Sequence, residues 1–169
     1  MKSHKSRTSG GFTLVELMIT VVIIGIVTGM AVPKFNVTVD RMKMRSGVGR
    51  LTSDLRLARS MAISNKDQYG LLFDMSKRTI TLFRDKISPA SYSFEFGDSI
   101  VRVDTLPPEF LWIWSDCANQ VVTFKPNGTS GFVGGGNVWA LGLTQKVVCI
   151  SWNSVLASTG RVQSNTYYY

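Results

Sequence analysis

The sequence predicts an α+β fold, in which one long N-terminal helix packs on a C-terminal head of antiparallel β-strands. Two observations lead to this prediction. An apolar run from Phe12 to Val32 continues into residues with helical spacing, and strand and turn signals replace that spacing from Gln68 onward. The chain has 169 residues, enough for one domain and an appendage. We therefore expect four segments, at residues 1–11, 12–33, 34–66 and 67–169.

The N-terminal apolar run is long enough to cross a bilayer. Its 21 residues would span about 31 Å as a helix. Lys2, Lys5 and Arg7 precede it, so this end is expected in the cytoplasm and the remainder of the chain outside it. A cleaved secretory signal is the alternative, but the run exceeds the usual apolar length of such signals. We therefore interpret residues 12–33 as a membrane anchor.

Glu16 is the unusual residue of this anchor. A carboxylate in a spanning helix costs about 2.5–3.5 kcal/mol near the bilayer centre and less near an end, so it rarely lacks a partner. Cleavage between Gly11 and Phe12 would place a new α-amino group one helical turn from Glu16, near the positive end of the helix dipole. The two charges could then neutralise each other within one chain or between stacked chains.

The run Gly11-Phe12-Thr13-Leu14-Val15-Glu16, after a short basic leader, resembles the processing motif of type IV prepilins and pseudopilins. The resemblance implies cleavage after Gly11 by a prepilin peptidase, N-methylation of Phe12, and pairing of Glu16 with a neighbouring subunit during assembly. Pro33 matches a proline found in many pilin helices. Because proline removes a backbone hydrogen bond and clashes with the preceding turn, a helix kink is expected there.

The segment after Pro33 reads as an amphipathic helix that ends near Asn65. One apolar face is marked at three- and four-residue spacings by Val48, Leu51, Leu55, Ala58 and Ala62. Strands are expected in the head at 69–73, 79–83, 91–96, 100–103, 120–124, 138–143 and 146–152. Residues 126–128 are expected to form a turn, and 134–136 a flexible glycine loop. We interpret Trp112, Trp114, Trp139 and Trp152 as core and inter-sheet packing, with an aromatic binding platform as the alternative.

Three segments of the chain narrow the resemblance to the GspH/FimT/FimU family of minor pilins and minor pseudopilins: residues 55–62, 124–128 and 160–162. The resemblance implies a minor pilin that primes type IV pilus assembly, is incorporated near the tip at low abundance, and supports twitching or adhesion. A minor pseudopilin of type II secretion is the first alternative. The second is a DNA-binding minor pilin for natural transformation. Some FimT-like members are thought to bind DNA through Gly-Arg-x-Arg, of which this chain keeps Arg161 but has Gln163 in place of the second arginine.

The two cysteines, Cys117 and Cys149, lack metal-ligand spacing, and whether they form a disulfide stays open at this point. A bridge would close a loop of about 33 residues and contribute roughly 3–4 kcal/mol. Pilins often carry a disulfide in the C-terminal half, whereas many pseudopilins do not. The resemblance therefore implies that a chain with these two cysteines is a subunit of a pilus and not a pseudopilin of a secretion system.

Composition argues against an enzyme. The single histidine, His4, lies in the leader, so no Ser-His-Asp or Cys-His arrangement can form in the processed chain, and no phosphate-binding loop motif occurs. We expect no metal and no cofactor. The formal charge of +8 is not the dense basic block of a dedicated nucleic-acid binder. The expected partners are the prepilin peptidase, major and minor pilins through helix packing, and the bacterial inner membrane. The head is expected in the periplasm and then, in the filament, at the cell surface.

Overall fold

The computed structural model describes residues 11–144 and 147–169. The chain forms two compact units, Met1–Thr38 and Val39–Tyr169, the second of which is the head. Helix α1, Leu14–Asn65, contributes residues to both units and ends where the sequence predicts. The expected leader lies outside the described residues apart from Gly11.

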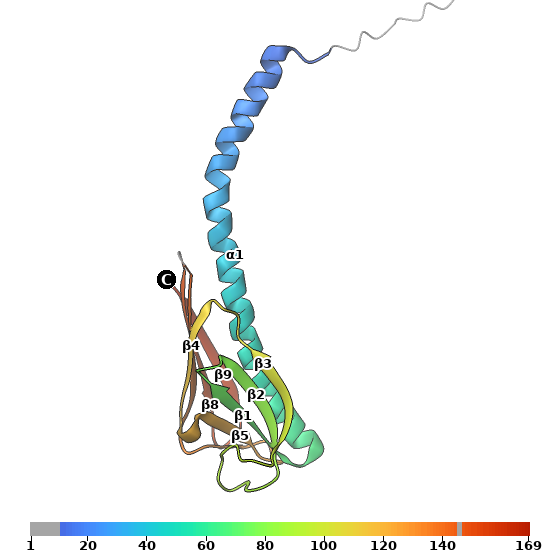
Figure 1. Ribbon diagram of the computed structural model, residues 1–169, viewed down its shortest axis with the longest axis vertical. Coiled ribbons are helices and arrows are strands. Elements are labelled where there is room, and N and C mark those ends of the chain that lie inside the picture. The colour runs from blue at the N-terminus through green and yellow to red at the C-terminus, as the bar shows by residue number, and fades with distance from the viewer. Residues whose placement is uncertain (1–10, 145–146) are drawn as a thin grey trace, which may run out of the picture. The chain divides into compact units, whose positions relative to one another are not determined.

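The head contains two antiparallel sheets (Figure 1). In sheet A the strand order is β3-β2-β1-β5-β6. Its strands are β1 Gln68–Asp74, β2 Thr79–Asp85, β3 Ser99–Thr105, β5 Val121–Phe124 and β6 Ser130–Gly131. In sheet B the order is β4-β7-β8-β9. Its strands are β4 Phe110–Cys117, β7 Gly134–Leu143, β8 Val148–Val155 and β9 Val162–Tyr168, and a short 3-10 helix, Ala118–Gln120, joins β4 to β5.

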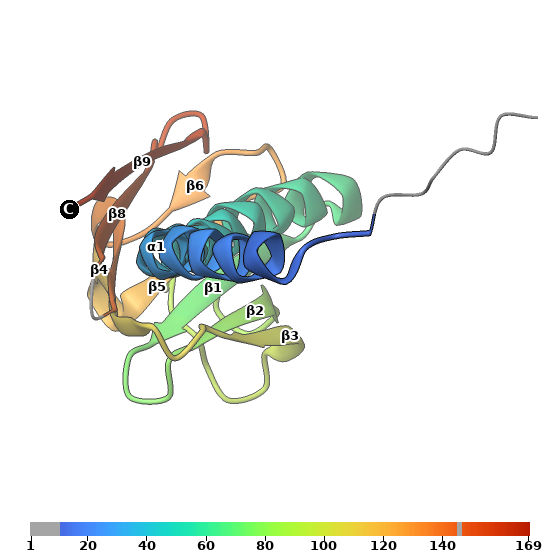
Figure 2. The same cartoon turned by 90° about the horizontal axis from the view of Figure 1, so that it is seen from above.

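The head part of α1 packs against both sheets (Figure 2). The five apolar residues predicted from helical spacing are all buried, so that prediction is confirmed. They form one core with side chains of sheet A such as Leu71 and Ile80, and with side chains of sheet B such as Ile113 and Val138. Burial of this apolar stripe, rather than helix propensity alone, stabilises this part of α1.

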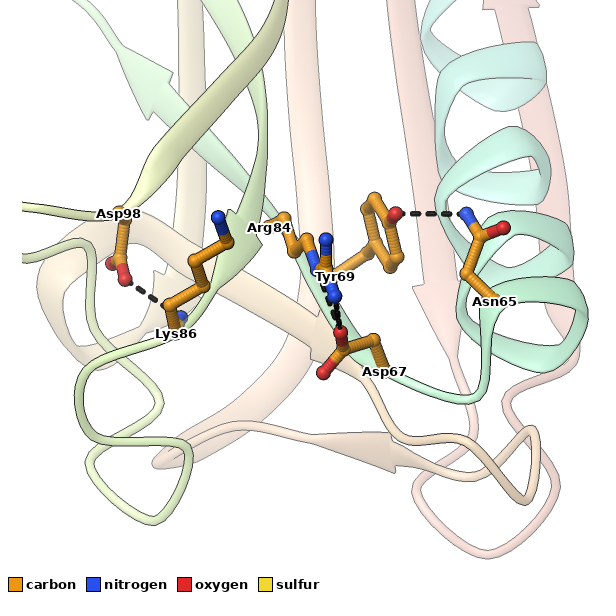
Figure 3. A network of polar contacts seen from close by, with 6 residues as sticks. All are labelled: Asn65, Asp67, Tyr69, Arg84, Lys86 and Asp98. Carbon is orange, nitrogen blue, oxygen red and sulfur yellow. Dashed lines mark hydrogen bonds and ion pairs between the residues drawn. The ribbon is translucent and has the colours of Figure 1, made fainter.

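Polar contacts fix the corner at which α1 turns into β1 (Figure 3). Asn65 Nδ2 donates to the Tyr69 hydroxyl at 2.8 Å, and Arg84 Nε donates to the Asp67 carboxylate at 2.6 Å. Lys66 lies between them in the left-handed region, with φ of 53°, which ends the helix. On the neighbouring strand end, the Lys86 backbone N–H donates to Asp98 at 2.9 Å. These contacts set the start of β1 and thereby the register of sheet A.

The segment 91–96, expected as a strand, is a loop instead. Its alternating Ser, Tyr, Ser, Phe, Glu and Phe mimic a strand, but side chains take its backbone bonds: Asp98 Oδ2 accepts the Glu95 N–H at 2.9 Å. The ring of Phe94 packs edge-on against Phe83 of β2, with centroids 5.0 Å apart. Side-chain hydrogen bonds thus replace strand pairing in this segment, and Phe94 covers part of β2.

The glycines at 134–136 open strand β7 and do not form the expected flexible loop. A Cβ on Gly134 would lie 2.6 Å from the Asp116 carbonyl oxygen, and one on Gly136 would lie 2.4 Å from the Val155 carbonyl oxygen. Glycine is required here because neighbouring backbones approach this strand too closely for a side chain.

The four tryptophans point away from the core, so their interpretation as core packing is wrong. Along β4, β7 and β8 the buried residues alternate with them, and none of the four is fully buried. Trp139 stacks on Trp152 with centroids 5.2 Å apart, and Trp112 on Trp114 at 6.0 Å. They form part of the outer face of sheet B.

Candidate assembly motif and partner surfaces

The start of α1 has the geometry of a capped helix terminus. The Thr13 hydroxyl accepts the backbone N–H of Glu16 at 3.2 Å, and the Thr13 carbonyl accepts that of Leu17 at 3.2 Å. Thr13 is thus the N-cap and Glu16 the third helical residue, the arrangement that the Thr-x-x-Glu pattern favours. The Thr-x-x-Glu pattern at residues 13–16 is the sequence signal for this cap. Glu16 is exposed in the first helical turn, near the positive end of the helix dipole.

The apolar part of α1 suits a lipid or helix-packed environment. By length and composition α1 can cross a membrane, and none of its most apolar stretch is buried in the structure. Its hydroxyl groups are satisfied inside the helix, since Thr20 donates to the Glu16 carbonyl and Thr28 to the Ile24 carbonyl. Polar groups inside a bilayer need hydrogen-bond partners within the protein, because the hydrocarbon core contains no water to bond them. The backbone is helical through residue 33, and the kink at Pro33 stays a prediction.

Known proteins resemble this chain both in its N-terminal segment and in its head. Residues 6–32 match the family described as the prokaryotic N-terminal methylation motif. Among solved structures, the type IV minor pilin FimU of Pseudomonas aeruginosa strain PAO1 matches with a TM-score of 0.53. The two chains are 18% identical, and the match covers 74% of this chain and 90% of that one. A search of curated proteins finds no match. The chain carries the prokaryotic N-terminal methylation motif and has the fold of a type IV minor pilin.

The N-terminal methylation motif and the apolar helix of this chain indicate membrane anchoring. Gly11 and Phe12 lie just before the first helical residue, and both are exposed. The described residues of the expected cleavage site are therefore accessible and lie outside the helix. Cleavage, methylation of Phe12 and pairing of Glu16 stay predictions.

Arg161, the residue expected to contact DNA, lies in a groove of about 430 Å³ beside the head part of α1. Arg56 and Arg59 of α1 line the same groove, and no carboxylate is among its described lining residues. Arg59 Nε donates to the Gly128 carbonyl at 3.0 Å and Arg59 Nη2 to the Thr159 carbonyl at 2.9 Å. The helix thereby holds the loop that carries Arg161.

Asp54 forms a second polar cluster that the sequence analysis did not single out. Its side chain is 5% exposed and forms an ion pair with Arg102 of β3, which also pairs with Asp104. Asp54 Oδ2 is buried and has no hydrogen-bond partner among the described residues. Burial raises the pKa of Asp54 to about 6, although the Arg102 charge acts in the opposite direction.

Cys117 and Cys149 are both buried and both free. Cys117 of β4 lies opposite Gly134 of β7, whereas Cys149 of β8 lies opposite Gly142. Eight residues of extended strand separate the two glycines, which corresponds to about 26 Å. A disulfide needs Cα atoms closer than about 7 Å. The disulfide left open above is thus contradicted, and so is the support that it lent to a pilus over a secretion system.

Proposed function

We propose that the chain is a minor pilin of a type IV pilus, a structural subunit that primes assembly and is incorporated near the tip at low abundance. The observation that carries the proposal is the joint presence of two features in one chain. A methylation motif includes the start of an unburied apolar helix, and the head has the fold of the minor pilin FimU. In this role the chain supports pilus biogenesis and twitching or adhesion, without catalysis.

Each part of the chain contributes separately. The prepilin peptidase cleaves after Gly11, and Phe12 is methylated. The apolar helix holds the subunit in the inner membrane with its head in the periplasm until assembly. Glu16, exposed at the third helical position, then pairs with the N-terminus of a neighbouring subunit. Such a pair neutralises a carboxylate that hydrocarbon would otherwise penalise.

Quantitative mass spectrometry of sheared surface filaments from the native host tests the proposal. A processed, N-methylated chain at a small fraction of the major pilin is expected. Detection only in the envelope fraction, despite abundant sheared pili, would contradict it. That outcome would favour the alternative, a minor pseudopilin of type II secretion.

A variant pair tests the motif itself. Glu16→Ala should be cleaved normally but should fall at least about tenfold in filaments, because a lost charge pair of ~1.4 kcal/mol already gives that factor. Gly11→Val should remain unprocessed. Asp40→Ala, which removes an acid of the same helix outside the motif, is the matched control. Equal incorporation of the Glu16 and Asp40 variants would remove Glu16 from the assembly mechanism.

A second candidate function, DNA binding, is favoured by the arginine groove. Three guanidinium groups without a carboxylate among the described lining residues suit a phosphate backbone. The test is a salt titration of the full chain in detergent with duplex DNA, comparing Arg161→Ala with Lys77→Ala at a distant turn. Binding that weakens with salt and falls only in the Arg161 variant is expected. No binding at low salt would exclude this function.

A further inference from the structure

The outer face of sheet B carries two rows of aromatic and aliphatic side chains. Register places Trp114, Trp139 and Trp152 in one row across β4, β7 and β8. A second row on the same face, two residues further along each strand, consists of Trp112, Leu141, Ile150 and Tyr167. We name these two rows the aromatic face. Exposed fractions of 37% for Trp114, 36% for Ile150 and 53% for Tyr167 show that solvent reaches it.

Charge is almost absent from this sheet. None of the four strands contains Lys, Arg or Glu, and Asp116 is their single charged residue, in a chain with formal charge +8. Both Asp116 oxygens are engaged: they accept the Asn137 backbone N–H and the Asn137 side-chain amide, each at 2.7 Å. The aromatic face therefore offers nothing to a phosphate or an anionic lipid. Depletion of charge with enrichment of Trp and Tyr is the composition of a protein–protein interface core.

The aromatic face is also held rigid before any partner arrives. Asn137 Oδ1 accepts the Trp152 indole N–H at 2.9 Å, so Asp116, Asn137 and Trp152 form one hydrogen-bonded chain across three strands. The stacked pair Trp139 and Trp152 is nearly parallel, at 5°. A surface whose large side chains are already ordered loses little entropy on binding.

A second apolar patch, on sheet A, bears on what covers the aromatic face. The β3 patch consists of Ile100 and Val103 on β3 and of Ile87 and Phe96 in the loop that precedes it, all more than half exposed. Ile100 and Val103 lie opposite Phe83 and Thr81 in the register, on the outer face of sheet A. Two different apolar patches on two sheets allow head-to-tail contact, which generates an open helical assembly where the rotation does not close into a ring. Self-complementary pairing through one patch would instead close a dimer.

We propose that the aromatic face binds the head of a neighbouring pilin-like subunit, through an uncharged apolar patch of the kind that this head itself carries at β3. The proposal rests on the filament role proposed above, in which the aromatic face is the surface that contacts a neighbouring subunit. The partner's patch needs no complementary charge, because the only carboxylate of sheet B is already satisfied. The β3 patch, at sheet A, remains available for contact with a second neighbouring subunit.

Photo-crosslinking of the full chain in its native host tests the contact directly. A benzophenone amino acid at Tyr167 should capture another pilin-like subunit, identified by mass spectrometry of the crosslinked band. The same probe at Ile63, 44% exposed at the end of α1, is the control and should give at least fivefold less product. Equal capture at both positions, or capture of carbohydrate alone at Tyr167, would overturn the proposal.

A charge substitution provides the matched functional test. Ile150→Glu should lower the fraction of subunit in sheared filaments at least tenfold, because its carboxylate would be desolvated at the interface. Ile63→Glu, at a similarly exposed isoleucine, should change that fraction less than twofold. If Ile150→Glu fails to fold, as judged by protease resistance, Tyr167→Lys at the edge strand replaces it with the same expectation.

The two proposals fail differently. Wild-type chain absent from filaments, with Tyr167 crosslinks to pilin-like subunits in the envelope, would remove the pilus role but keep the contact. Wild-type and Ile150→Glu chains incorporated equally would remove the contact but keep the pilus role.

Discussion

The stability of the head depends on pH through the buried carboxylate of Asp54. Its pKa, raised by burial to about 6, exceeds the ordinary value of 3.8. The folded chain therefore binds this proton more tightly than the unfolded chain does. Its contribution to stability is fully present below pH 4 and is lost as the pH rises to about 6, after which it is constant. Arg102, Asp104 and Arg50 are the charged groups that act on it.

The Asp54→Asn variant should abolish this part of the pH dependence. Between pH 4 and 7 the free energy of unfolding of the wild type should fall relative to the variant by up to about 3 kcal/mol. Urea unfolding of the full chain in detergent, followed by tryptophan fluorescence, measures it, since all four tryptophans lie in the head. The other shifted carboxyl groups, such as Asp85, are common to both proteins and cancel. Parallel curves would show that Asp54 is ionised throughout.

Single residues were predictable from the sequence where their chemistry is local. Gly11, Phe12 and Glu16 were assigned from a fixed order of neighbouring residues, and their roles stay predictions. The Asp54–Arg102 pair joins residues 48 apart and depends on which strand comes to lie beside α1. No local pattern contains that information.

At the scale of elements, strands were predicted where alternation or turn chemistry was clear. The hairpin of β1 and β2 was confirmed. Strand β9 was missed because, as an edge strand that pairs only with β8, it needs no apolar alternation and is mostly polar. Strand β4 was missed because its exposed and half-buried positions, Leu111, Trp112 and Trp114, are apolar as well, so the sequence shows no apolar–polar alternation. A large aromatic side chain does not reveal from sequence which face of a sheet it occupies.

The glycine-rich start of β7 gives a test at this scale. Gly134→Ala should lower the free energy of unfolding by roughly 1–3 kcal/mol, because φ there is 102° and the added Cβ would meet the Asp116 carbonyl oxygen. Gly49→Ala is the control, at an exposed helical position with nothing within 4 Å of the added Cβ. It should raise stability by about 0.5–1 kcal/mol. Thermal unfolding of both variants in the same detergent distinguishes them, and shifts of the same sign would contradict this account of β7.

At the scale of the whole molecule, the general class was predictable and the arrangement of the head was not. A helix followed by strands predicted α+β, and helical periodicity identified the buried face of α1. Two separate sheets around one helix follow from long-range pairing, such as β1 with β5. The two rows of the aromatic face form only because the strands of sheet B are ordered β4-β7-β8-β9. That order brings together side chains that are far apart in the sequence.

The thiols give a prediction for the intact protein. Burial raises the pKa of Cys117 to about 11 and raises that of Cys149 as well, so both stay protonated near neutral pH. A thiol reagent should label the native chain slowly and should label two groups per chain after denaturation. The chain should migrate identically on reducing and non-reducing gels. A single labelled group, or none, would mean that the cysteines are oxidised.

The separation of those two cysteines has a consequence for how the protein matures. A head whose thiols stand eight strand residues apart does not depend on a disulfide oxidase in the compartment where it folds. Cells that lack such an oxidase should accumulate this subunit at normal levels, even where disulfide-bonded subunits of the same filament are lost. The proportions of the subunits in the filament would then change with the redox state of the envelope, while the amount of this subunit stays the same.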